Sequence, residues 1–335
     1  MKDIFKALTK NTFDFSKFQE LGLVFIIIIF GALVQFNNSD FLTKGNLNNL
    51  FTNVAVLGVL SVGMMLVLLT GGIDLSVGSI MALAGMVCAL TLKEHPGIPV
   101  IVIIFMGAAI GAVVGFVTGS LVARFSVLPI IASLGMMNIV RGLTYIVAGG
   151  AWVVAYQLPD GFKNMAQNSF WGINYLILIT ILIFIIFAFF INLTRTGRRV
   201  YAVGSSPEAA NIIGLPSKNI VTVVYVLAGA LFGIGGVMWT SRFAVAQGDA
   251  AIGYEIFVIA ACVLGGVSVN GGRGGMIGLI LGVTLFGMLQ NALPMMGVST
   301  FWQQAIQGIV ILIAIIMNVL VKRNNDRVNL RRRVI

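Results

Sequence analysis

The side chains most often used for catalysis and metal binding are rare in this sequence. Its only histidine, His95, precedes Pro96 in a polar break between apolar runs, where a solvated loop residue is expected. Its two cysteines, Cys88 and Cys262, lie in apolar stretches without Cys-x-x-Cys spacing, which is typical of buried structural thiols. The sequence contains neither a Gly-x-x-x-x-Gly-Lys-Ser/Thr run for nucleotide phosphate nor a His-Glu-x-x-His metal motif. We therefore expect no catalytic residue, no metal site and no cofactor in this chain.

One segment joins paired glycines to an acidic residue between two long apolar runs. Residues 69–79 read Leu-Thr-Gly-Gly-Ile-Asp-Leu-Ser-Val-Gly-Ser. The Gly-Gly pair predicts an interrupted helix, and Asp74 stands where it could cap the helix that follows. Broken helices occur in membranes where their backbone is buried or lines a cavity. Both a capped turn at the membrane surface and a gate of a solute pathway fit this pattern. The residues of this helix break are Gly71, Gly72, Asp74 and Ser76.

A second polar segment, residues 194–218, carries the signals of a short helix. Ser206 can cap its start, Pro207 suits the first helical position, and Glu208 favours the positive end of the helix dipole. Gly214 and the proline two residues later predict its end after about two turns. Such a helix suits docking to a partner, and an ordinary structured turn fits the same local signals. The residues expected to couple it to a partner are Pro207, Glu208, Ala209, Ala210 and Gly214.

These segments separate apolar runs long enough to cross a lipid bilayer. The 335-residue chain is 59% hydrophobic and 10% charged, whereas soluble domains carry about 25% charged residues. Because about 20 apolar residues span the hydrocarbon core, the sequence predicts an all-α, polytopic transmembrane bundle of about ten spans. Eight to eleven spans remain compatible with the Gly-rich breaks. The predicted spans are 21–36, 51–69, 74–92, 99–122, 127–148, 172–193, 219–241, 255–269, 275–293 and 300–321.

The distribution of positive charge predicts the orientation of these spans. With the N-terminus inside, 16 of the 21 lysines and arginines fall on the cytoplasmic side, as positively charged loops of membrane proteins do. Both termini are therefore expected in the cytoplasm, and the net charge of +10 is explained by topology rather than by nucleic acid. The expected parts are an N-terminal segment 1–20, a transmembrane domain 21–321 that includes the loop 194–218, and a basic tail 322–335.

Glycines at a spacing of four residues indicate how the helices pack. Gly107, Gly111, Gly115 and Gly119 form one such row, and Gly274, Gly278 and Gly282 form another. Small residues at this spacing let two helix backbones approach closely in a membrane. These rows predict tight helix pairs and say nothing about a solute.

Two of the motifs resemble a known family of permeases. The segment Glu208–Gly214, Glu-Ala-Ala-x-x-x-Gly, resembles the coupling loop of ATP-binding-cassette importer permeases. Residues 70–78, Thr-Gly-Gly-Ile-Asp-Leu-Ser-Val-Gly, resemble the signature of the branch for ribose, xylose, arabinose, galactose and autoinducer-2. The similarity continues through 264–278 and 297–299 and covers roughly residues 20–320. One departure is Gly-Ser-Ser before Pro207, where relatives more often have Gly-Gly-Asn.

The resemblance implies a permease subunit of a binding-protein-dependent importer for carbohydrate uptake in the bacterial cytoplasmic (inner) membrane. The implied partners are an ATPase subunit, usually two fused cassettes, an extracytoplasmic solute-binding protein, and a second permease as homodimer or heterodimer. ATP and Mg would bind to the ATPase partner, and no nucleic acid is expected. Import of nucleosides or branched-chain amino acids is the alternative. An ion-coupled secondary transporter is less favoured, because few acidic residues lie within the predicted spans.

Polar residues within the spans are candidates for the translocation pathway. Charged and polar groups are costly in a bilayer and usually face the interior of the bundle. Hydrogen bonds between helices explain such residues equally well. The candidates are Asn138 and Arg141 in the fifth span and Gln290 and Asn291 in the ninth.

Overall fold

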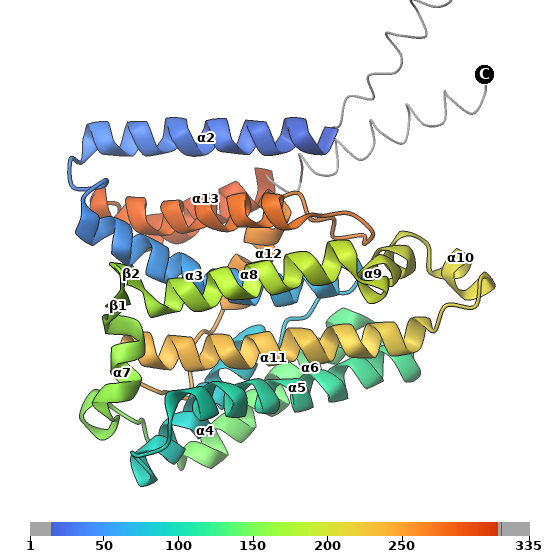
Figure 1. The fold of residues 1–335 in the computed structure, drawn as a ribbon, viewed down its shortest axis with the longest axis horizontal. Coiled ribbons are helices and arrows are strands. Elements are labelled where there is room, and N and C mark those ends of the chain that lie inside the picture. Colours follow the sequence, from blue (N-terminus) through green and yellow to red (C-terminus); the bar gives the residue numbers. More distant parts are fainter. Residues whose placement is uncertain (1–14, 314–315, 317–335) are drawn as a thin grey trace, which may run out of the picture.

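The computed structural model describes residues 15–313 and residue 316, and within these the chain is mainly helical, with one two-stranded hairpin (Figure 1). The predicted tail 322–335 and most of the predicted segment 1–20 lie outside the described residues. The elements are α2 (Phe15–Asn37), α3 (Lys44–Leu69), α4 (Val77–Glu94), α5 (Val100–Arg124), α6 (Pro129–Ala148), η1 (Ala155–Gln157), α7 (Asp160–Gln167), β1 (Ser169–Phe170), β2 (Ile173–Asn174), α8 (Tyr175–Leu193), α9 (Arg195–Ser205), α10 (Pro207–Ile212), α11 (Ser217–Phe243), α12 (Tyr254–Leu264) and α13 (Met276–Met295). An apolar helix, Thr300–Ile313, follows α13.

The prediction of an all-α, polytopic membrane bundle is confirmed. In the described part of the chain, eight helices are long and apolar enough to cross a membrane, and α12 and Thr300–Ile313 are shorter apolar helices. Nine predicted spans coincide with one of these helices, and the tenth, 300–321, begins with Thr300–Ile313 and continues into positions outside the described residues. The largest difference is at α3, which begins at Lys44 because Thr43 caps a polar first turn that hydropathy does not detect. The eight long helices are α2, α3, α4, α5, α6, α8, α11 and α13.

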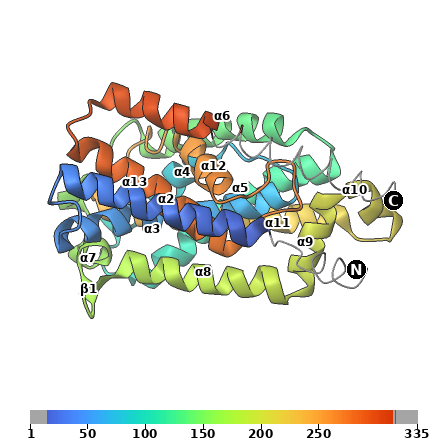
Figure 2. The ribbon, with the colours of Figure 1, turned by 90° about the horizontal axis from the view of Figure 1, so that it is seen from above.

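Helices α3 and α11 form the centre of the bundle. Nearly every residue of α3 from Val54 to Leu69 is buried, whereas α8 exposes large apolar side chains such as Ile185 and Phe189. Helices α6 and α8 lie along opposite edges, with α3 and α11 between them (Figure 2). An apolar periphery around an apolar core is what a lipid solvent requires.

The predicted glycine rows are confirmed as helix contacts, except that Gly274 lies in the turn before α13 and not on the helix. Gly107, Gly111 and Gly115 of α5 face the backbone of α11, and a Cβ added at Gly111 would collide with the carbonyl oxygen of Gly229. Gly278 and its neighbour one turn later press in the same way on the end of α12. The small residues therefore bring helix backbones into direct van der Waals contact.

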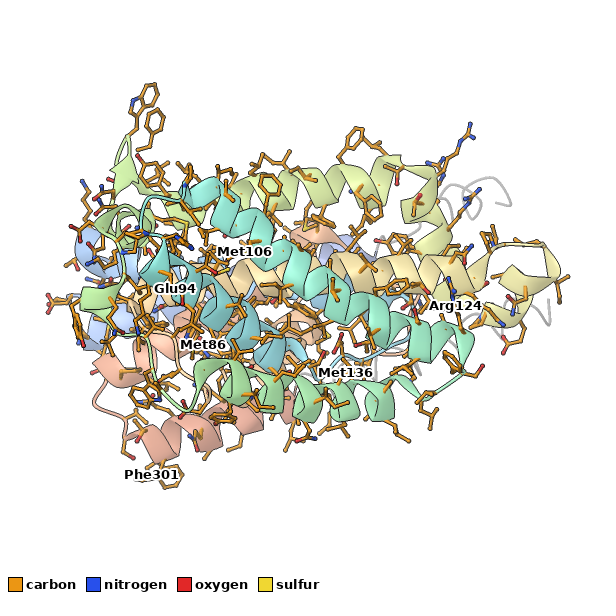
Figure 3. The ribbon with its side chains drawn as sticks, turned by 90° about the horizontal axis from the view of Figure 1, so that it is seen from below. Met86, Glu94, Met106, Arg124, Met136 and Phe301 are labelled. Carbon is orange, nitrogen blue, oxygen red and sulfur yellow. The ribbon has the colours of Figure 1, made fainter. Side chains whose placement is uncertain are left out.

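The two ends of the bundle carry different structures. One end has η1, α7 and the hairpin of β1 and β2, which hydropathy did not predict, and the other has α9 and α10 (Figure 1). Helix α5 runs between these ends, since Glu94 just before it and Arg124 at its close lie toward opposite ends (Figure 3). The hairpin pairs Ser169 with Asn174, and Trp171 at its tip is 91% exposed.

Candidate functional site

The short helix predicted after residue 206 is present as α10. The Ser206 hydroxyl accepts a hydrogen bond from the Ala209 N–H at 3.3 Å, and Pro207 occupies the first turn. Gly214 closes the helix with φ of +74°, a left-handed conformation that favours glycine. The N–H of Leu215 then returns to the Ala210 carbonyl at 3.0 Å. The predicted boundaries of this helix are confirmed.

Helix α10 presents an apolar surface that the sequence analysis missed. Ile212 is 85% exposed and Ile213 is 71% exposed, while Ala210 is the buried residue of the helix. Glu208 and Ala209 are exposed beside them. Apolar side chains that project from the loop end of a bundle, beyond its membrane-spanning helices, are typical of a protein–protein contact. The sequence signal that could have predicted this surface is the adjacent pair Ile212 and Ile213 in an otherwise polar loop.

Helix α9 joins α10 to the rest of the bundle through a junction of glycine turns. Gly204 is buried, and a Cβ there would collide with the Leu69 carbonyl oxygen and lie 2.9 Å from the Gly272 nitrogen. The Gly272 N–H donates to the same Leu69 carbonyl at 3.0 Å. The Tyr201 hydroxyl donates to the Gly274 carbonyl at 2.7 Å, and burial raises its pKa, which keeps it protonated as a donor.

This glycine junction unites three distant segments of the chain. It consists of the end of α3 with Gly71, the end of α9 with Gly204, and the turn before α13 with Gly271 and Gly272. Its closest contacts join backbone atoms of the three segments, together with the Ser205 side chain beside Gly272. Tyr201 and Gly204 were not singled out from the sequence, where they appear as an ordinary tyrosine and glycine in a basic loop.

The predicted break after α3 is present. The chain leaves α3 through Gly71, with φ of +80°, and the Gly72 N–H donates to the Val67 carbonyl at 3.1 Å. The expectation that Asp74 caps the next helix is wrong in its detail. Its carboxylate accepts from the N–H of Ser76 at 2.8 Å and from the Ser76 hydroxyl, and α4 begins only at Val77. The short Asx-turn holds the break in place before the helix starts.

The break also buries polar atoms that have no partner. Asp74 is 0% exposed, and its second carboxylate oxygen has no hydrogen-bond partner among the described residues. The same holds for the Tyr225 hydroxyl of α11, which lies 2.7 Å from the position of a Cβ on Gly72. Burying a polar group without a hydrogen-bond partner costs free energy. A different conformation of the break, or a bound ligand or water, would supply partners for the Asp74 carboxylate and the Tyr225 hydroxyl.

Because of this break, α4 begins in the middle of the bundle. Gly85 of α4 packs on Gly236 and Thr240 of α11, and Met81 packs on Gly236. Val77 stands one turn earlier, so it lies level with residue 232, near the middle of α11. The amino end of α4, with its unpaired N–H groups, therefore lies inside the membrane-spanning part rather than at its surface.

A second interruption brings another helix end to the same place. The loop 244–253 lies between α11 and α12, and α12 spans only about 16 Å at 1.5 Å per residue. A Cβ on Gly78 would collide with the Ala251 carbonyl oxygen and lie 3.2 Å from the Glu255 carboxylate. The amino ends of α4 and α12 thus meet within the bundle, and both carry a partial positive charge.

Arg141, a predicted pathway residue, holds this loop. Its guanidinium donates to the carbonyl oxygens of Gly248 and Ala250, both at 2.7 Å. The structure therefore brings Arg141 next to the helix ends, in contact with backbone. Asn138 is exposed one turn earlier on α6 and donates to the Leu134 carbonyl of its own helix at 2.9 Å.

Asn291 and Gln290 lie apart from the helix ends. Asn291 of α13 forms a reciprocal pair of side-chain hydrogen bonds with Asn46 of α3, both at 3.0 Å. Gln290 is half-buried beside it. This geometry agrees with the alternative that Asn291 ties α13 to α3 through Asn46. The pathway role of Gln290 and Asn291 stays a prediction.

Replacing Asn291 with alanine is expected to lower the free energy of unfolding by about 0.6–1.7 kcal/mol, the range for hydrogen bonds between membrane helices. Asn46→Ala should cost the same, and the double variant little more, because the two side chains bond each other. Denaturant titration in detergent measures the loss. Impaired solute uptake with unchanged stability would instead assign Asn291 to the pathway.

Comparison with known proteins gives consistent matches over most of the chain. The family described as the permease component of the branched-chain amino acid transport system matches residues 46–315. The chain is 39% identical to the ribose import permease protein of Bacillus subtilis, over 89% of this chain and 91% of that one. It is 37% identical to the L-arabinose transporter permease protein of Azospirillum brasilense, over 89% and 86%. No solved structure matches it.

A third relative covers the chain still more fully. The galactose/methyl galactoside import permease protein of Escherichia coli is 32% identical over 93% of this chain and 97% of that one. With eight candidate spans in its described part, this is a multi-pass protein of the bacterial inner membrane. The family contributes the permease of a transporter and is not itself a catalytic enzyme. The chain belongs to this family of ATP-binding-cassette transporter permeases.

Proposed function

We propose that this chain is the membrane-spanning subunit of an ATP-driven importer for a monosaccharide or a similar small polar solute. The observation that carries the proposal is α10, an exposed helix connected through the glycine junction to the break after α3 and to the turn before α13. ATP-driven import by a chain without a nucleotide motif requires an ATPase partner, and α10 offers that partner a surface.

The solute class rests on the relatives. Ribose, L-arabinose and galactose appear in the names of the three relatives described above. The description of the wider family names branched-chain amino acids, which supports that solute class as the second candidate. Uptake assays with labelled pentoses, hexoses and leucine separate the two.

We assign coupling to Pro207, Glu208, Ala209, Ala210 and Gly214, together with the exposed Ile212 and Ile213. ATP binding and hydrolysis in the partner would displace α10 and α9. Gly204 would transmit that displacement to the end of α3 and to the turn before α13, because their backbones touch. The access of the solute would then alternate between the two sides of the membrane.

We assign the pathway to the region where α4 and α12 begin. Half-helices whose amino ends lie near the bilayer midplane form solute sites in other transporters. Their N–H groups are donors for hydroxyl oxygens, and Gly71, Gly72, Asp74 and Ser76 form the break that positions α4. This segment would act as the gate when the glycine junction moves.

The proposed assembly places α9, α10 and both termini in the cytoplasm. The end with α7 and the β1–β2 hairpin would then face the solute-binding protein. A second permease copy would complete the membrane part, and an ATPase subunit with two cassettes would supply the ATP and Mg sites. The charge asymmetry of 16 to 5 supports this orientation.

Reconstitution tests the proposal directly. The chain is co-expressed with a candidate ATPase subunit and binding protein, purified, and inserted into liposomes. Uptake that requires ATP and the binding protein is expected. Failure to associate with any ATPase subunit, or uptake driven by an ion gradient without ATP, would contradict the proposal.

Two changes in α10 are expected to uncouple ATP hydrolysis from uptake while the chain still inserts. Glu208→Lys reverses the charge in the first turn, and Gly214→Pro cannot adopt the φ of +74° that ends the helix. Hydrolysis and uptake are measured together in liposomes. Glu94→Lys, at the opposite end of the bundle, is the charge-reversal control for membrane insertion and for ATP hydrolysis. Normal uptake in both α10 variants at matched expression would remove the coupling assignment.

A further inference from the structure

A groove of about 1110 Å³ lies between α3, α8 and α13, with the β1–β2 hairpin at one end. It is separate from the helix ends at α4 and α12 and from α10. Its volume exceeds the roughly 300–1,000 Å³ typical of small-molecule pockets. The α8 side of the groove is formed by residues on the exposed face of that helix, such as Ile181 and Ile185.

The lining of the groove changes from polar to apolar along its length. The end beside the hairpin has Lys44, Asn48 and Gln167, whereas the other end has Phe184 and Ile280. Among the described residues that line it, Lys44 is the one charged side chain. The occupant that this surface fits has an anionic or strongly polar head and an apolar body.

The depth of the groove matches one leaflet of a bilayer. Its wall on α3 extends from Lys44 to Ala55, about 16 Å at 1.5 Å per residue. Half of the hydrocarbon core measures about 15 Å. The hairpin beside its polar end exposes Phe170 and Trp171, whose rings stack with centroids 5.6 Å apart. Exposed aromatic rings of this kind are typical of the membrane–water interface.

The polar groups deeper in the groove are already satisfied. The Thr180 hydroxyl donates to the Ala55 carbonyl at 3.0 Å, and the Thr284 hydroxyl donates to the Ile280 carbonyl at 2.8 Å. Asn174, at the hairpin, donates to the Ala166 carbonyl at 2.6 Å. The deep part therefore offers apolar surface and few free partners for the hydroxyl groups of a sugar.

We propose that this groove binds a glycerophospholipid, with an anionic headgroup beside Lys44 and an acyl chain along Phe51, Ile181 and Phe184. Each buried CH₂ group contributes about 0.8 kcal/mol, so a chain seated over this depth is held mainly by apolar contact. Lys44 supplies the preference for negative charge. Under the orientation proposed above, the lipid belongs to the outer leaflet, and the site itself does not depend on which solute is transported.

Native mass spectrometry of the purified complex tests the site. The complex is delipidated in mild detergent and titrated with phosphatidylglycerol or with phosphatidylcholine of the same acyl chains. We expect one tightly retained phosphatidylglycerol per copy of this chain. Ile181→Trp, which fills the groove, should abolish that retention, and Ile186→Trp, on the same helix outside the groove, should leave it unchanged.

The headgroup preference has its own pair of variants. Lys44→Gln should weaken phosphatidylglycerol binding about fivefold, the effect of one basic residue near an anionic lipid. Lys93→Gln, also exposed but outside the groove, is the control. Equal retention in the Ile181 and Ile186 variants would overturn the lipid site. Equal binding of both lipids to the wild type would overturn the anionic preference, and occupation by a second copy of this chain would overturn both.

Discussion

Replacing Gly204 with alanine is expected to reduce ATP-driven uptake at least about fivefold while ATP hydrolysis continues. The added methyl group would collide with the Leu69 carbonyl oxygen, which already accepts the Gly272 N–H. Overpacking of this kind costs about 1–3 kcal/mol. A shift of that size changes the ratio of two conformational states by roughly 5- to 150-fold. Uptake and hydrolysis measured in the same liposomes show the loss.

Two further variants make the Gly204 result interpretable. Gly135→Ala on α6 adds the same methyl group where nothing lies within 4 Å, so uptake should be unchanged. Tyr201→Phe removes only the hydrogen bond to the Gly274 carbonyl and should reduce coupling by a smaller factor. Full uptake by Gly204→Ala at matched expression would show that the glycine junction does not transmit the motion of α10.

Replacing Arg141 with methionine is expected to lower the free energy of unfolding by about 3–6 kcal/mol. The guanidinium makes two short hydrogen bonds to the Gly248 and Ala250 carbonyls, and bonds to a charged group contribute about 1.5–3 kcal/mol each. Both loop residues are buried, so water cannot readily replace the lost donor. Denaturant titration of the purified chain measures the change.

The Arg141 variants also separate a supporting role from solute contact. Both hydrogen bonds come from one guanidinium nitrogen, Nη1. Arg141→Lys keeps the charge and several donors on one nitrogen but has a shorter side chain, so it should show an intermediate loss. Asn138→Ala, one turn away on α6, should be nearly neutral because that side chain is exposed and bonds only its own helix. If Arg141→Met keeps its stability and loses uptake, Arg141 touches the solute and the supporting role is wrong.

The sequence predicts those features that depend on local chemistry. Hydropathy locates the spans, because both the helices buried in the bundle, such as α3, and the helices that face lipid, such as α8, are apolar. Ser206 and Gly214 define α10, since a cap and a left-handed residue act within one turn. The rows at Gly111 and Gly278 predict close packing because spacing alone places their members on one helix face.

The features that the sequence leaves open depend on tertiary contact. The break at Gly71 is visible from the sequence, but the depth at which α4 begins depends on the contact of Gly85 with α11. Arg141 and Asn291 both appear as polar residues in apolar helices, and the partners that distinguish them are more than 100 positions away. The glycine junction joins three such segments, which no local pattern relates.

The contact between α5 and α11 restricts how the bundle can rearrange. Gly111 and Gly115 press against the backbone of α11 with no side chain between, and Gly107 meets the Val237 side chain and the Gly233 carbonyl. Helices that slide past each other normally adjust by changing side-chain rotamers, and this pair has almost none at its seam. We therefore expect α5 and α11 to move together as one rigid body that spans the membrane. Conformational changes during transport would then bend the chain at the two interrupted segments, residues 70–76 and 244–253.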